Sequence, residues 1–532
     1  MKKYILSVCT MFALAGVTLT SCSDAESMRE LKLARVLSPT NLTAVSSTLE
    51  PSITLSWDAS SNAESYVVEV YEEDPDFATT PVRTIDTQET SCVIADLLGE
   101  TEYNFRVKGL ASGVEESKWS TITRKTAAEQ ILAVSFNDIE ENEITVTWPT
   151  NKTIDRLTVK NGESVLNTYT IDETAAALGV FNVSGLTGGT EYTIEVFLGE
   201  KRRGFITVKT EISKPVSDYN ITAENISTDN SIADILKGVA DQAAAAGKSS
   251  YSVTVQIPAG QTVEFYSIKA EDGSKDNVTL PDGMSVYFYG DKDNMPTIDF
   301  GGVRLDIAGK HETIAFQKVR LVGTGYLINQ SNACDVTNLS FEICEMSGFM
   351  GNTLLRTQGS NSPKIDNIEV KSCVIHDCSN NYSVFDLRKS VVKTVLIQNT
   401  TIYNSATGGK CIVQSDANMN QLTFSGVTLY NVCGNAQYFI DFGSTEMGPD
   451  KFVFENVLMA KTADDNTAKV IRASSAPMVN NSYYTNDWYK AIDGATMIDV
   501  EAAEVFEDPD NADFTVKEAY IGLGAGDPHW LP

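Results

Sequence analysis

The stretch NIEVKSCVIH, residues 367–376, decides the fold because its pattern recurs along the second half of the chain. Segments that align with it without gaps begin at residues 313, 338, 394, 421 and 451, and a looser copy begins at residue 285. In each copy the second, fourth, seventh and ninth positions are apolar or small, as in short strands broken once by a bend. A further short strand follows each copy. This repeat predicts a parallel β-helix whose equivalent positions stack into columns.

The repeat gives Cys373 a structural interpretation. It occupies the seventh position, which predicts an inward side chain, and a buried cysteine behaves as a small apolar residue. The other residues at this position are Val319, Cys344, Thr400, Val427 and Val457. The chain has only 3 histidines, too few to complete most Cys/His zinc sites. Cys344 and Cys373 would lie about 4.8 Å apart along the stack, which is compatible with a disulfide but does not require one.

The two positions after the ninth predict outward columns. His376, Tyr403 and Tyr430 share the tenth position and form a predicted stack of rings. Such a stack either holds the coils in register or offers an exposed strip against which a sugar ring can pack. The eleventh position predicts a polar ladder with a structural role; its residues are Asp377, Asn404 and Asn431.

Charged residues recur in the short strand that follows each copy. They are Arg356, Asp386, Arg388, Asp441 and Arg472. Guanidinium groups suit the carboxylates of uronic acids, and carboxylates accept hydrogen bonds from sugar hydroxyls. The alternative is a set of ion pairs between coils on a solvated face. Both interpretations stay open from the sequence.

The first residues predict export and lipid anchoring. Lys2 and Lys3 precede an apolar run that ends in LTSC, which is typical of a lipoprotein signal peptide over residues 1–21 with lipid attached to Cys22. Asp24 and Glu26 resemble the acidic tag of lipoproteins displayed on the cell surface. We therefore expect a short tether over residues 22–37 and an outer-membrane, surface-exposed location. No later stretch is long and apolar enough to span a bilayer.

The net charge excludes one class of partner. The chain has 71 acidic against 41 basic residues, a formal charge of −30. Such a field repels nucleic acid, so we expect no nucleic-acid partner.

Two further repeats lie before the β-helix. LLGETEYNFRV and LTGGTEYTIEV match at equal offsets, and each follows a tryptophan, Trp57 or Trp148. They resemble fibronectin type III domains, over residues 38–127 and 130–211, which are predicted to act as spacers or interaction modules. Residues 213–250 then predict a linker and a capping helix, opened by a capping box at Ser231 and Asp234.

The remainder, residues 251–532, predicts the right-handed parallel β-helix with a C-terminal cap. YSVTVQIPAGQTVEF (251–265) resembles the pectate-lyase-like group, and FEDPDNADFTVKEAYIGLGAGDPHWLP (506–532) resembles the end of bacterial surface proteins from polysaccharide-utilisation systems. The fold class is thus all-β: two sandwiches, a capping helix and a β-helix. The resemblance implies a polysaccharide ligand such as pectin, and an outer-membrane transporter is a candidate partner.

The same columns argue against catalysis. A calcium-dependent lyase needs converging carboxylates and an arginine or lysine base. The fifth position offers no acidic pair on adjacent coils; it reads Gln317, Glu342, Lys371, Gln398, Ser425 and Glu455. Arg320 and Glu345 are predicted to form a plain salt bridge. We expect a non-catalytic glycan-binding lipoprotein without a cofactor. One alternative is a polysaccharide lyase, for which calcium would be a candidate cofactor. The other is an adhesion protein acting through the fibronectin-like domains.

Overall fold

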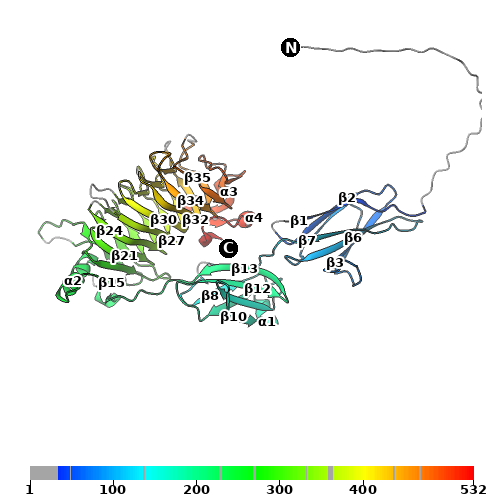
Figure 1. Cartoon of the computed structure of the whole chain (residues 1–532), viewed down its shortest axis with the longest axis horizontal. Coiled ribbons are helices and arrows are strands. Elements are labelled where there is room, and N and C mark those ends of the chain that lie inside the picture. Colours follow the sequence, from blue (N-terminus) through cyan, green and yellow to red (C-terminus); the bar gives the residue numbers. More distant parts are fainter. Residues whose placement is uncertain are drawn as a thin grey trace, which may run out of the picture. The chain divides into compact units, whose positions relative to one another are not determined.

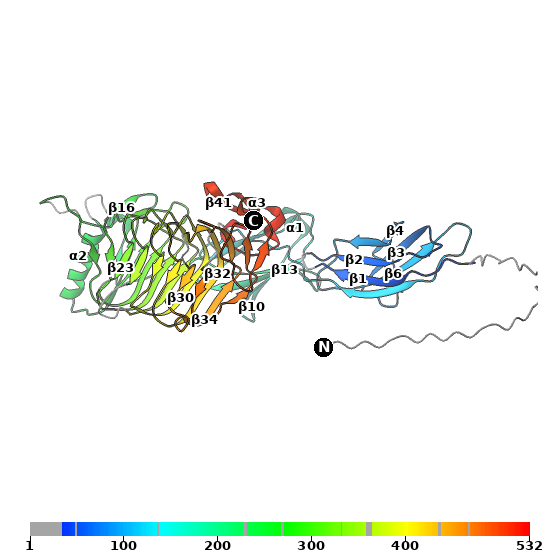
Figure 2. The same cartoon turned by 90° about the horizontal axis from the view of Figure 1, so that it is seen from above.

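The computed structural model contains two compact units, Met1–Ala128 and Glu129–Pro532 (Figures 1 and 2). It describes residues 34–47, 50–135, 138–226, 231–267, 271–330, 332–357, 364–434, 438–465 and 469–531. The predicted signal peptide and Cys22 lie outside these residues, so lipid attachment stays a prediction. Within them, no helix has the length and apolar character needed to cross a membrane.

The first unit is a sandwich of two antiparallel sheets. One sheet has the order β1 (Thr40–Ser46), β2 (Ile53–Asp58) and β5 (Ser91–Ile94). The other has the order β4 (Arg83–Thr87), β3 (Ser65–Glu72), β6 (Glu102–Leu110) and β7 (Ser120–Lys125). Trp57 and Tyr103 are buried between the sheets. The hydroxyl of Tyr103 also accepts a hydrogen bond from the Leu98 N–H at 3.0 Å, which fixes the corner before β6.

A second sandwich opens the second unit. Its sheets are β11 (Val180–Ser184) with β8 (Glu143–Thr147), and β10 (Ser164–Thr170), β9 (Arg156–Asn161), β12 (Glu191–Leu198) and β13 (Lys201–Lys209); α1 (Glu173–Leu178) lies between β10 and β11. Trp148 and Tyr192 are buried at the places matching Trp57 and Tyr103. The Tyr192 hydroxyl accepts from the Thr187 N–H at 2.9 Å, so the corner contact recurs as well.

The rest of the second unit is a parallel β-solenoid with three faces. The first face holds β15 (Tyr251–Gln256), β18 (Met284–Tyr289), β21 (Gly309–Gln317), β24 (Cys334–Glu342), β27 (Lys364–Lys371), β30 (Val391–Tyr403), β32 (Met419–Val432), β34 (Pro449–Glu455) and β37 (Met478–Asn480). The second face holds β16 (Thr262–Glu264), β19 (Thr297–Asp299), β22 (Arg320–Val322), β25 (Glu345–Ser347), β28 (Val374–His376), the later halves of β30 and β32, β35 (Leu458–Thr462), β38 (Tyr483–Thr485) and β39 (Thr496–Ile498). The third face holds β17 (Val278–Thr279), β20 (Leu305–Asp306), β23 (Ile328–Gln330), β26 (Leu355–Thr357), β29 (Phe385–Asp386), β31 (Val413–Gln414), β33 (Ile440–Asp441) and β36 (Ile471–Arg472).

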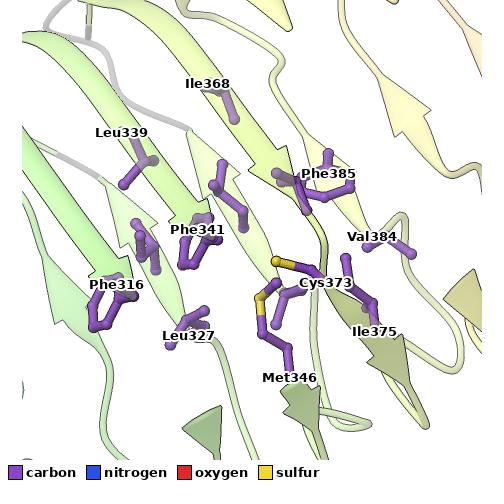
Figure 3. Close-up of a cluster of buried hydrophobic side chains, with 14 of the residues drawn as sticks. Phe316, Leu327, Leu339, Phe341, Met346, Ile368, Cys373, Ile375, Val384 and Phe385 are labelled. Atoms are coloured by element: carbon purple, nitrogen blue, oxygen red, sulfur yellow. The ribbon is translucent and has the colours of Figure 1, made fainter. Parts of the chain in front are cut away.

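The gapless register predicted from the repeat is confirmed. Phe316 pairs with Phe341, and Phe341 with Val370, so the fourth position forms one inward column. The two phenylalanine rings stack with centroids 5.4 Å apart (Figure 3). Cys373 is 1% exposed at the inward seventh position, as predicted, and both it and Cys344 are free thiols in the structure.

The bend between the first and second faces uses the left-handed backbone region at the sixth position. Lys318, Ile343, Ser372 and Asn399 have φ of 58°, 55°, 53° and 49°. This conformation reverses the side-chain direction within a few residues, at a steric cost for residues other than glycine and asparagine. A column of bends therefore runs along the solenoid.

One end and one side of the stack are covered. β14 (Tyr219–Ile221), η2 (Ala223–Asn225) and α2 (Ile232–Ala245) cover the first coil, where Leu236, Val239 and Ala243 join the core (Figure 1). Ser231 caps α2 by accepting from the Asp234 N–H, as the sequence predicts. The C-terminal elements are α3 (Ala502–Val505), β40 (Phe506–Asp508), η3 (Pro509–Asn511), β41 (Asp513–Val516), α4 (Glu518–Ile521) and η4 (Pro528–Trp530). They pack against the second face.

Candidate functional site

The third face carries a column of outward polar residues, here called the polar column. It consists of Asn329, Arg356, Asp386, Gln414, Asp441 and Arg472, each paired in register with the next. Their sequence neighbours, such as Leu355 and Phe385, point inward and are buried, because successive residues of a strand face opposite sides. Five steps of about 4.8 Å make this column roughly 24 Å long.

The two aspartates of the polar column are held by bidentate arginines. Arg388 donates from Nε and Nη2 to Asp386 at 2.8 and 2.6 Å. Arg472 donates from the same atoms to Asp441 on the adjacent coil at 2.7 and 2.8 Å. The Arg472–Asp441 pair joins neighbouring coils, as the alternative predicts, whereas the Arg388–Asp386 pair lies within one coil. The hydrogen bonds to the carboxylates raise the pKa of both arginines, so the guanidinium groups stay cationic.

These pairs still present surface to a ligand. The side chains of Arg388 and Arg472 are 43% and 34% exposed, whereas those of their aspartates are 8% and 7% exposed. The carboxylates are thus covered by flat guanidinium groups that face solvent. Each fork uses Nε and Nη2, and Nη1 is a further donor of the same guanidinium group.

Aromatic rings lie against the two arginines of the polar column. Arg356 donates from Nη1 to the Tyr326 hydroxyl at 2.9 Å, and its guanidinium lies 5.6 Å from that ring centre. Arg472 lies 4.7 Å from the centre of the Tyr438 ring. Guanidinium over an aromatic face is a favourable contact that limits side-chain motion. The polar column is therefore a preorganised surface of donors, acceptors and flat faces.

The predicted stack of rings forms, but it is not an open strip. His376 and Tyr403 stack at 4.8 Å with an angle of 3° between their planes, and Tyr430 is in register with Tyr403. Phe514 from β41 then covers both tyrosines, and Tyr430 is only 3% exposed. The expectation of an exposed strip is wrong at Tyr430 because the C-terminal cap packs on these rings. In this structure the Tyr430 hydroxyl donates to Asp510.

His376 lies between two carboxylates at the edge of this cap. Its Nδ1 is 2.8 Å from Asp377 and its Nε2 is 3.3 Å from Glu345. Burial lowers the pKa of His376, but the hydrogen bonds to Glu345 and Asp377 outweigh burial and raise the pKa overall. Glu345 in turn accepts from Arg320 at 2.9 Å, which is the salt bridge predicted from the sequence.

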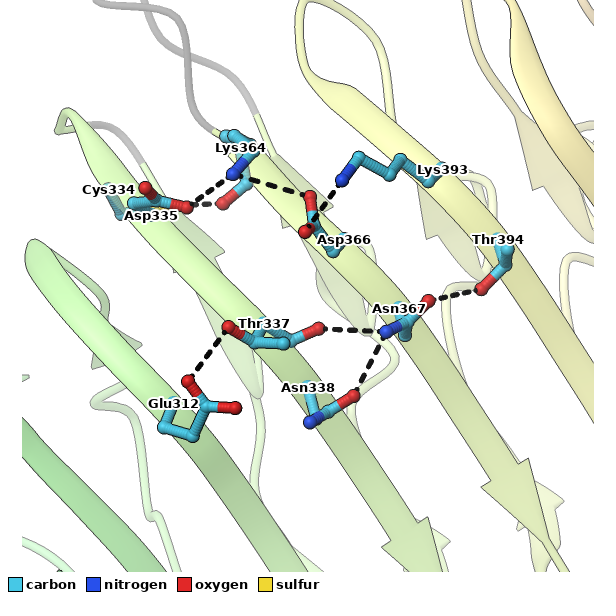
Figure 4. Close-up of polar contacts among 10 residues, drawn as sticks. All are labelled: Glu312, Cys334, Asp335, Thr337, Asn338, Lys364, Asp366, Asn367, Lys393 and Thr394. Atoms are coloured by element: carbon cyan, nitrogen blue, oxygen red, sulfur yellow. Dashed lines mark hydrogen bonds and ion pairs between the residues drawn. The ribbon is translucent and has the colours of Figure 1, made fainter.

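The polar ladders have a structural role. Asn431 donates to Asn404 at 2.7 Å at the predicted ladder position. On the first face Asn367 donates to Asn338 at 3.0 Å, and Thr394 donates to Asn367 at 2.7 Å (Figure 4). Ion pairs on the same face, including Lys393 with Asp366 at 2.8 Å, also join neighbouring coils.

Charged residues at the fifth position, beside the bend, form ion pairs. Lys371 lies 2.7 Å from Glu369 and 3.9 Å from Glu342, as expected for paired surface charges. Across the part of the chain that the structure describes, no group of three or more His, Cys, Asp or Glu residues is placed to hold a metal ion.

The sequence singled out four members of the polar column and missed two. Asn329 and Gln414 were not recognised because the short strands of this face are two or three residues long and their starting points differ by one residue. The alternation of inward and outward side chains would have found them. Tyr326 and Tyr438 were missed because they lie just before these strands.

Comparisons with known proteins agree with this architecture. The family model of the fibronectin type III domain matches residues 37–126, and the model of a domain of unknown function, DUF5123, matches residues 395–530. No curated protein matches the chain.

Solved structures similar to the chain include a two-domain fibronectin type III segment of chicken tenascin (22% identity, TM-score 0.24, covering 32% of this chain and 99% of that one). The FN1–FN3 domains of chicken CNTN1 are similar at 16% identity and a TM-score of 0.15, covering 33% of this chain and 65% of that one. The FN5 domain of Drosophila Lar is similar at 21% identity and a TM-score of 0.15, covering 18% and 98%. The family model over residues 37–126 and the strand topology show an N-terminal fibronectin type III region followed by a parallel β-solenoid.

Proposed function

We propose that this chain is a surface-anchored, non-catalytic lipoprotein of the outer membrane that binds a polysaccharide along the polar column. The observation that carries the proposal is the register of the column. Its six polar residues repeat at the spacing of the coils over roughly 24 Å, and a polymer of repeating units is the ligand that suits such a surface.

The chemistry of the column favours a uronate-containing glycan such as pectin. Arg388 and Arg472 are cationic and half-exposed, and each has Nη1 as a further donor to an acceptor such as a sugar carboxylate. Gln414 is partly exposed and supplies an amide that can both donate to and accept from hydroxyls, whereas Asn329 is buried. The chain as a whole carries −30, so attraction to an anionic glycan is confined to this local row of guanidinium groups.

A pair of charge-matched variants tests the proposal. Arg356→Gln removes a cation from the polar column, and Lys393→Gln removes one from the first face; Asp366, the partner of Lys393, keeps Lys364 at 3.5 Å. The full chain is compared on affinity gels containing polygalacturonate, pectin or a neutral glucan. Arg356→Gln should weaken binding about tenfold, equivalent to about 1.4 kcal/mol, and Lys393→Gln less than twofold.

Other outcomes would favour a different explanation or a different function. Equal weakening by both variants would mean that only net charge matters. No binding to any polysaccharide would contradict it and favour the alternative of adhesion through the fibronectin-like region. In that case deletion of residues 38–211 should abolish function. Release of unsaturated products would favour the polysaccharide lyase, with calcium as the metal to test.

A further inference from the structure

A second concave site lies over the column of bends, between the first and second faces, and the polar column takes no part in it. It consists of two adjoining hollows with volumes of about 340 and 270 Å³. Both are lined by Ile343, Ser372, Asn399 and Asp527. We call the two together the bend groove. The volume of the larger hollow is at the lower end of the range for small-molecule sites, and that of the smaller hollow is just below it.

Three separate parts of the chain build the bend groove. The larger hollow is lined on one side by Glu342, Lys371 and Gln398 of the solenoid. On the other side it is lined by residues 207–210 of the second sandwich, at and just after the end of β13. The smaller hollow is lined by solenoid residues and by the C-terminal segment around His529. A groove assembled from three elements far apart in sequence is not a by-product of the repeat, because the repeat supplies only its floor.

Buried charges hold the second sandwich against the solenoid. Glu211 forms ion pairs with Lys292 at 2.8 Å and with Lys318 at 2.7 Å, and all three side chains are at most 8% exposed. Lys292 also donates to the Ile139 carbonyl at 2.9 Å. Loss of Glu211 would leave the buried Lys318 without its carboxylate, which is strongly unfavourable. The sandwich wall of the groove is therefore fixed in place.

Hydrogen bonds hold the C-terminal wall equally firmly. Asp527 accepts from the Thr401 hydroxyl at 2.8 Å, and its own N–H donates to the Thr428 hydroxyl at 2.9 Å. The Trp530 indole donates to Thr401 at 2.8 Å. Both threonines occupy the outward eighth position of their coils. The same position holds Arg320, Glu345 and Val374, which line the smaller hollow.

The lining of the smaller hollow matches a sugar ring better than an ion. Met295, Ile343 and Val374 offer an apolar side, suited to the C–H face of a pyranose. Hydrogen-bonding groups of both kinds surround it, with Arg320 and His529 as donors and Glu345 as acceptor. Arg320 and Glu345 pair with each other at 2.9 Å, so their charges cancel and a ligand without net charge fits best.

We propose that the bend groove binds one neutral sugar residue, a site separate from the polar column. The choice of a sugar rests on the proposed function, whereas the groove itself rests on its own residues. The second sandwich is then a wall of a binding site and more than a spacer.

A steric block tests this inference. Val374→Phe fills the smaller hollow, and Val322→Phe adds the same ring at an outward, half-buried position that does not line it. Saturation-transfer NMR on the full chain uses glucose, galactose, rhamnose and galacturonate as probes. At least one neutral sugar should give a signal that Val374→Phe reduces more than fivefold and Val322→Phe leaves within 30%. If Val374→Phe does not fold, Glu345→Gln replaces it and should reduce the signal at least threefold.

The outcomes separate the two sites. No signal from any neutral sugar, or a signal that survives both Val374→Phe and Glu345→Gln, would overturn the bend groove while leaving the polar column untouched. A neutral-sugar signal that persists in Arg356→Gln, with polysaccharide binding absent throughout, would contradict the proposed function and retain the groove.

Discussion

The carboxyl group of Asp527 gives a quantitative prediction about pH. Burial raises the pKa of Asp527 to about 7, although hydrogen bonds from the His529 N–H and the Thr401 hydroxyl act in the opposite direction. The side chain of an unfolded aspartate has a pKa of about 3.9. The difference of about 3 units corresponds to about 4 kcal/mol of destabilisation once the carboxyl is ionised in both states.

The direction in which stability changes with pH follows from proton binding. Because the folded state holds the proton of Asp527 more tightly, the contribution of this group to stability is greatest below about pH 4. That contribution falls as the pH rises toward about 7. Between pH 5 and pH 8 the loss attributable to Asp527 should be about 3 kcal/mol. Asp527→Asn, which is neutral at every pH, should lack this part of the slope and be at least as stable as the wild type at pH 8.

Urea denaturation at pH 5, 6, 7 and 8 measures this difference, with tryptophan fluorescence reporting on Trp530 near the site. Other titrating groups contribute equally to both proteins, so the difference between the two curves isolates Asp527. Hydrogen exchange in residues 506–531 shows whether the effect is local to the C-terminal segment. Parallel pH curves for the wild type and Asp527→Asn would refute the reasoning.

Three further predictions concern the packing that positions the sites. Glu211→Gln leaves Lys318 buried without its carboxylate and Lys292 with only Glu140 at 3.2 Å, and should cost about 3–5 kcal/mol in calorimetry; a cost below 1 kcal/mol would mean that the sandwich is not fixed by these charges. Phe341→Ala opens a cavity beside Phe316 and should lower the free energy of unfolding by about 3–5 kcal/mol in urea titrations, with a loss under 1 kcal/mol inconsistent with the stacked core. Glu345→Gln removes a hydrogen-bonded carboxylate from His376 and should lower the pKa of that histidine in an NMR titration; an unchanged or higher pKa would contradict the assigned cause.

The sequence was sufficient to predict the solenoid because each coil repeats the same local preferences. An inward column such as Ile314, Leu339 and Ile368 needs no knowledge of distant residues, since equivalent positions stack by symmetry. The same logic placed Cys373 in the core and His376 beside Tyr403. The gapless alignment did not include the last coil, where Tyr483 and Tyr484 continue the second face, because fewer aliphatic residues hide the pattern.

Contacts outside the repeat were beyond sequence reasoning. Phe514 covers Tyr430 from a segment with no fixed offset to the coils, so the loss of the exposed strip could not be foreseen. The ion pairs of Glu211 likewise join two folding modules whose docking depends on shape. At the polar column the charged residues were visible, but their bidentate pairing depends on side-chain geometry that only the structure supplies.

The most direct test of the central claim is one incubation of the full chain with polygalacturonate that records binding and ultraviolet absorbance together. A non-catalytic protein should retain the polysaccharide reversibly with no rise in absorbance from unsaturated ends, with or without calcium, and Arg356→Gln should bind about tenfold more weakly. A steady rise in absorbance, or full retention by Arg356→Gln, would contradict the account.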